Sequence, residues 1–78
     1  MKIEHDSEAD AIYYRLSPKA YRFGEDLDHQ RRVDYVEDGT PIGVEFLYVS
    51  QGIDLRSVPS ADKIGRALSS LKIKILAS

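Results

Sequence analysis

Two alternating segments on either side of an Asp-Gly turn form the clearest pattern of apolar and polar residues in the chain. Residues 31–36 and 41–49 flank Asp38-Gly39, which favours a tight hairpin because both central positions of such a turn take positive φ. Counting from this tip pairs Val33 with Val44, Tyr35 with Ile42, Arg32 with Glu45 and Asp34 with Gly43. The pairs divide into an apolar and a polar face, which supports the register. Because the far end of 41–49 carries apolar residues on the polar face as well, we expect this strand to be central there.

A second hairpin is predicted at the start of the chain. Residues 2–5 and 11–16 alternate as strands do. The polar turn 6–10 between them holds short side chains that can bond their own backbone. The register that keeps the apolar residues on one face pairs Ile3 with Tyr14 and Met1 with Leu16.

The connection between the two hairpins, residues 17–30, is predicted to be polar and largely irregular. Residues 20–23 are expected to pair briefly with a neighbouring strand, and Gly24-Glu25-Asp26 is expected to end that pairing. The connection is therefore not counted as a strand.

The C-terminal part of the chain is predicted to contain a linker and a helix. Residues 51–59 form the linker, and its Ile53 and Leu55 are expected to enter the core. Ser60 follows a proline and is a candidate N-cap for a helix over 60–71. An apolar stripe at i, i+4 and i+7 supports this helix and consists of Ile64, Leu68 and Leu71.

A last strand is predicted over residues 72–76, where Ile73 and Ile75 would face inward and two lysines outward. This strand would extend the sheet or pair across a dimer. The chain as a whole is thus predicted to be a single small α+β domain, with a four-stranded antiparallel meander of two hairpins (1–50), a linker (51–59), one helix (60–71) and a short C-terminal strand (72–76).

Length and composition narrow the class of protein further. The chain has 78 residues and no cysteine, which excludes a disulfide framework and thiolate chemistry and favours the cytoplasm. Its first residues contain no apolar run of a signal peptide, and no stretch approaches the length of a membrane span. We therefore expect a cytoplasmic protein without a membrane partner.

Charge is unevenly distributed along the chain. Residues 1–50 carry six Lys/Arg and eleven Asp/Glu, or −5, and residues 51–78 carry five and two, or +3, which together give −2. An acidic sheet half disfavours nucleic acid as a partner, because phosphate binding needs clustered basic residues. It would suit a small basic protein instead.

Two segments resemble a known family of small bacterial and archaeal proteins. Residues 1–16, with Asp6-Ser7-Glu8-Ala9-Asp10-Ala11 followed by an aromatic-rich strand, resemble the opening of the domain of unknown function 2283 family. Residues 33–47 resemble that family's second hairpin. The resemblance implies no known chemistry, and it suggests an antitoxin-like partner role. Gln30-Arg31-Arg32 departs from the more acidic or apolar residues expected before the second hairpin.

Metal binding and catalysis have few candidate residues. Asp6, Glu8 and Asp10 form an acidic cluster that could hold a hard cation with help from His5, although a turn held by side-chain-to-backbone bonds is the favoured interpretation. His5 shares a strand face with Ile3 and is expected to be partly buried. The sequence predicts no catalytic set and no cofactor.

Candidate interaction residues lie in two places. Tyr13 shares a strand face with Arg15, and an exposed aromatic residue beside arginine is typical of an interface, unless the helix half covers it. Glu25, Asp26 and Asp28 form an acidic run that could face a partner. We therefore expect a non-catalytic protein–protein interaction domain that forms a homodimer or binds a small basic protein. A metal-binding or enzymatic domain and a purely structural domain are the alternatives.

Overall fold

The computed structural model describes residues 2–78. Within these residues the elements run in the order β1 (Lys2–Asp6), β2 (Ala11–Arg15), β3 (Phe23–Asp28), β4 (Arg31–Tyr35), β5 (Pro41–Leu47), a 3-10 helix η1 (Val49–Gln51), β6 (Ile53–Asp54), α1 (Ala61–Ser70) and β7 (Ile75–Ala77). The first five strands form an antiparallel sheet, and β6 and β7 form a small parallel pair. The α+β class predicted from the sequence is confirmed.

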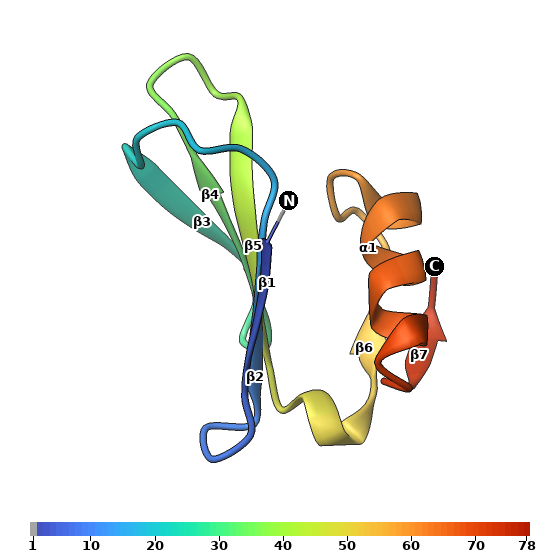
Figure 1. The fold of residues 1–78 in the computed structure, drawn as a ribbon. Coiled ribbons are helices and arrows are strands. Elements are labelled where there is room, and N and C mark those ends of the chain that lie inside the picture. The colour runs from blue at the N-terminus through green and yellow to red at the C-terminus, as the bar shows by residue number, and fades with distance from the viewer. Residues whose placement is uncertain (1) are drawn as a thin grey trace.

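The fold has two layers (Figure 1). The five-stranded sheet, here called the main sheet, has the order β1-β2-β5-β4-β3. Residues 49–78, here called the C-terminal layer, bring η1, β6, α1 and β7 against one of its faces. The opposite face, here called the open face, is covered by no helix or strand of the described residues.

The predicted number of strands was wrong, because β3 is a full strand within the supposed connection. Gly24-Glu25-Asp26 continues the pairing with β4 instead of ending it. Cross-strand contacts hold this polar strand: the Phe23 ring stacks on Tyr35 with centroids 5.1 Å apart, and Asp26 forms an ion pair with Arg32 at 3.2 Å. Such contacts depend on the partner strand, so the alternation of β3 alone did not reveal them.

Strand order also departs from a simple meander. β2 pairs with β5, so the first hairpin joins the far side of the second, and β5 is central as expected. The first hairpin has the predicted pairing of Ile3 with Tyr14, while the pairing expected for Met1 lies outside the described residues. The second hairpin keeps three predicted pairs: Val33 with Val44, Arg32 with Glu45 and Asp34 with Gly43. A register shift beyond Asp34 pairs Tyr35 with Pro41 instead of Ile42.

One apolar core lies between the main sheet and the C-terminal layer. Sheet residues of this cluster, each at most 5% exposed, contribute one side of it, and they are Ile12, Tyr14, Val33, Val44 and Phe46. The C-terminal layer contributes the other side with Val49, Ile53, Leu55, Val58, Ile64 and Leu68. The expected burial of Ile53 and Leu55 in the predicted linker is thus confirmed.

The last strand differs from its prediction. β7 is shorter than 72–76 and pairs with β6, so the predicted extension of the main sheet is wrong. Lys72, at φ 61°, turns the chain after α1 and so delays the strand. Ser60 occupies the N-cap position as expected, but its side chain makes no capping hydrogen bond because its backbone is left-handed, at φ 56°.

Two polar contacts fasten the C-terminal layer to the main sheet. The Asp10 carboxylate accepts hydrogen bonds from the Ser50 backbone N–H at 2.9 Å and from its hydroxyl at 2.7 Å. The Arg31 guanidinium donates to the backbone carbonyls of Asp54, at 3.1 Å, and of Arg56. Arg31 differs from the residues that the family resemblance led us to expect at this position, and it holds the C-terminal layer against the main sheet. Among residues 2–78 we find no helix long and apolar enough to cross a membrane.

Candidate functional site

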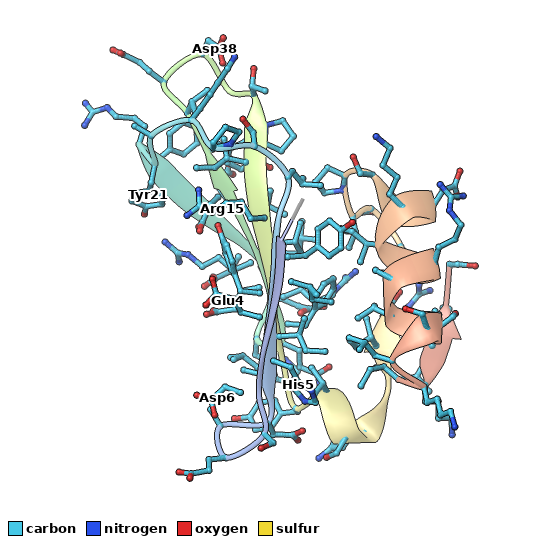
Figure 2. The ribbon with its side chains drawn as sticks, in the orientation of Figure 1. Glu4, His5, Asp6, Arg15, Tyr21 and Asp38 are labelled. Carbon is cyan, nitrogen blue, oxygen red and sulfur yellow. The ribbon has the colours of Figure 1, made fainter. Side chains whose placement is uncertain are left out.

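The open face of the main sheet presents every second residue of its strands. Figure 2 shows Glu4, Arg15 and Tyr21 on this side of the sheet, and His5 on the side that bears α1. Strand alternation and the register place the following residues on the open face: Glu4, Asp6, Ala11, Tyr13, Arg15, Arg32, Asp34, Gly43, Glu45 and Leu47. Tyr13 and Arg15, both predicted interaction residues, therefore share the open face. The alternative that the helix half covers Tyr13 is wrong.

Tyr13 lies flat across the centre of the open face. A Cβ atom on Gly43 would collide with the Tyr13 hydroxyl, so the glycine of β5 is what allows the ring to cross that strand. The hydroxyl donates a hydrogen bond to Asp34 Oδ2 on β4 at 3.0 Å. Partial burial of the ring, followed by the bond to Asp34, raises the pKa of Tyr13 to about 12.

Arg32 extends the same flat layer towards β3. A Cβ atom on Gly24 would lie 2.6 Å from the Arg32 guanidinium, so a second glycine accommodates this side chain. The guanidinium contacts the Asp26 carboxylate at 3.2 Å, the Asp34 carboxylate at 3.5 Å and the Tyr21 hydroxyl at 3.4 Å. Tyr13 and Arg32 therefore both contact the Asp34 carboxylate. Both side chains lie along the sheet, so the centre of the open face is flat and is here called level.

Two hollows adjoin this level centre at the end of the sheet that carries the β1–β2 turn. The larger, of about 370 Å³, is lined by Glu4, Asp6, Ala11, Tyr13 and Glu45, among others. The smaller, of about 130 Å³, reaches the β3–β4 turn and is lined by Asp26, Asp28, His29 and Arg32, among others. Glu45 and Leu47 line both hollows. The two hollows, joined by their shared lining residues, are here together called the acidic groove.

Beyond the acidic groove, on the side away from the β1–β2 turn, the chain carries three exposed cations. Arg15 ends β2 with an exposed side chain, and its guanidinium donates to the carbonyl of Ser17 at 3.3 Å. Exposed Lys19 and Arg22 follow in the connection to β3. Arg15 lies two residues beyond Tyr13 along β2, on the side of the acidic groove away from the β1–β2 turn, and these three cations are here called the basic end.

The metal candidates are not brought together. Asp6 Oδ1 accepts backbone N–H bonds from Glu8 and Ala9, both at 3.1 Å, which is the favoured turn interpretation. Asp10 is engaged with Ser50, and His5 faces the other side of the sheet from Asp6. His5 is exposed, so its predicted partial burial was wrong. Among residues 2–78 no three His, Cys, Asp or Glu side chains are grouped to hold a metal ion.

The acidic run of β3 is largely neutralised within the chain. Asp26 pairs with Arg32, and Asp28 pairs with Arg31 at 3.0 Å. The Arg31 guanidinium also holds the pKa of Asp28 below its ordinary value. Glu25 pairs in register with Val33 and so lies on the face away from the groove. The run is therefore not one patch.

Sequence reasoning missed Glu4 and Glu45, which lie on either side of Tyr13 in register. The pairing of β2 with β5 brings them together, and these strands are far apart in the sequence. Once that pairing is given, strand alternation alone would identify both residues.

Comparison with known proteins agrees with the resemblance in the sequence. Residues 2–50 match the model of a family described as "Protein of unknown function (DUF2283)". No curated protein and no solved structure gives a match. The matched residues span the whole main sheet and more than half of the chain, so this protein belongs to the DUF2283 family of proteins of unknown function.

Proposed function

We propose that this protein is a non-catalytic interaction domain, and that the acidic groove of its open face binds a basic segment of another polypeptide. The observation that carries this proposal is the composition of the groove, in which carboxylates of β1 and β5 surround an apolar floor. The C-terminal layer covers the other face and leaves this one accessible.

The chemistry of the groove suits lysine and arginine side chains. Such a side chain has an apolar stem and a charged head. Ala11 and Leu47 offer contact to the stem, and Glu4 and Glu45 offer charge to the head. The Tyr13 ring lies beside them and is fixed by its hydrogen bond to Asp34. Aromatic residues are enriched in protein interfaces.

A metal-binding or enzymatic role for the acidic turn is less favoured, because its carboxylates already have other partners. Asp6 accepts bonds from the turn backbone, and Asp10 fastens the C-terminal layer. An antitoxin that neutralises a small basic toxin is one protein that would use such a groove. A purely structural domain would have no need of it.

Binding of a fluorescein-labelled octalysine peptide, followed by fluorescence anisotropy, tests the proposal. We expect the variant Glu4→Gln/Glu45→Gln to bind about tenfold more weakly than the wild type, because each exposed ion pair contributes up to about 1 kcal/mol. The control Glu37→Gln/Asp62→Asn removes the same charge from exposed sites outside the groove and should change the affinity less than the groove variant does.

Equal weakening in the two variants would mean that the peptide senses only net charge. That result, or no binding to the wild type, would refute the acidic groove as a binding site.

A further inference from the structure

We propose that a second copy of this chain is a partner of the open face, in a two-fold dimer whose sheets pack face to face with antiparallel strands. The acidic groove of each copy then receives the basic end of the other. This inference rests on the proposed function, since it assigns a partner to the same groove.

Charge complementarity within one face carries the inference. Glu4 and Glu45 lie towards the β1–β2 turn, and Arg15 lies towards the other end of β2. A two-fold axis parallel to the two faces and perpendicular to the strands reverses the strand direction between copies. It therefore places the acidic groove of each copy over the basic end of the other. The face is then complementary to itself, as an isologous interface requires.

The centre of the face is shaped for such contact. The Tyr13 ring lies close over Gly43 and the Arg32 guanidinium close over Gly24, which keeps both side chains near the backbone of the sheet. The bond from Tyr13 to Asp34 holds the ring in that position. Two such level centres can approach each other closely around the two-fold axis.

Charge argues against the other ways of pairing two copies. Parallel strands would place acid over acid and base over base. Edge-to-edge pairing of two β3 strands would bring the exposed Glu25 side chains of the two copies towards each other, and like charges opposite each other are destabilising. Charged edge strands commonly prevent such pairing.

The available area predicts a weak dimer. Five strands about 4.8 Å apart and about 17 Å long offer roughly 400 Å² of flat surface per copy. Stable complexes bury about 800 Å² per partner, so we expect association only at micromolar concentrations or above. The charge contacts should also weaken in about 1 M salt, where the Debye length is about 3 Å.

A charge-swap experiment tests this dimer by sedimentation equilibrium with the full chain. The acid-reversed variant, Glu4→Arg/Glu45→Arg, and the base-reversed variant, Arg15→Glu/Arg22→Glu, should each be monomeric, because each places like charges at both contacts. An equimolar mixture should form a heterodimer, because the two reversals restore both contacts. Circular dichroism confirms folding, and Glu45→Arg with Arg15→Glu is the milder pair if a double variant fails to fold.

The outcomes separate this inference from the proposed function. A wild-type chain that stays monomeric at about 1 mM overturns the dimer, as does a mixture that stays monomeric. If octalysine still binds the groove in that case, only the second copy is excluded as its partner. If octalysine does not bind either, the proposed function fails as well.

Discussion

Gly43 and Gly24 determine how two larger side chains lie on the open face. Neither glycine has positive φ, so both are explained by space and not by backbone conformation. Gly43 admits the Tyr13 ring and Gly24 admits the Arg32 guanidinium. In the sequence, Gly43 is recognisable only as a weak strand residue, because its role depends on a side chain from another strand.

The substitution Gly43→Ala should therefore destabilise the protein through Tyr13. The added methyl group displaces the ring and weakens its bond to Asp34, and we expect a loss of about 1–3 kcal/mol in the free energy of unfolding. Urea denaturation of a double-mutant cycle measures the coupling. In a Tyr13→Ala background the same substitution should cost much less. An equal cost in both backgrounds would show that Tyr13 does not lie over Gly43.

At the scale of elements, local patterns predicted the hairpins and missed what depends on neighbours. Both hairpin registers followed from alternation and turn residues, except beyond Asp34. β3 escaped prediction because cross-strand pairs with β4 stabilise it. β7 was placed in the wrong sheet because a short apolar segment does not indicate its partner, which is β6.

The candidate site was predicted in part for the same reason. Tyr13 and Arg15 were identified because they share one strand face. The acidic groove was not, because it forms only when β2 and β5 become neighbours. Asp10 was a candidate metal ligand, but its carboxylate accepts hydrogen bonds from Ser50, forty residues away in the sequence.

Arg31 offers a test of how the C-terminal layer is held. The variant Arg31→Gln should lose about 1–2 kcal/mol of unfolding free energy, because its hydrogen bonds to the Asp54 and Arg56 carbonyls are lost. Hydrogen exchange should also become faster at the Ile53 and Leu55 amides, which bond to the segment of β7. The exposed Arg66 on α1 supplies the matched control Arg66→Gln. Equal effects of the two variants would exclude Arg31 as a fastening contact.

At the scale of the whole molecule, the chain divides at the end of the family match. Residues 2–50 form the main sheet with its open face, and nearly all of the C-terminal layer follows residue 50. That layer buries the apolar face of the sheet and supplies half of the core. The division leaves the polar open face as the accessible face of the family domain, which is why we assign the interaction to it.

An ¹⁵N NMR titration with octalysine tests that assignment most directly, because it reports where on the molecule a basic chain binds. We predict that the amide shifts of Ala11, Tyr13, Glu45 and Leu47 change together and saturate, while those of α1 stay constant. A shallow groove of about 440 Å³ beside α1, lined in part by Asp62, Gly65 and Arg66, is the competing surface. Changes confined to α1, or spread evenly over all acidic residues, would contradict the open face as the binding surface.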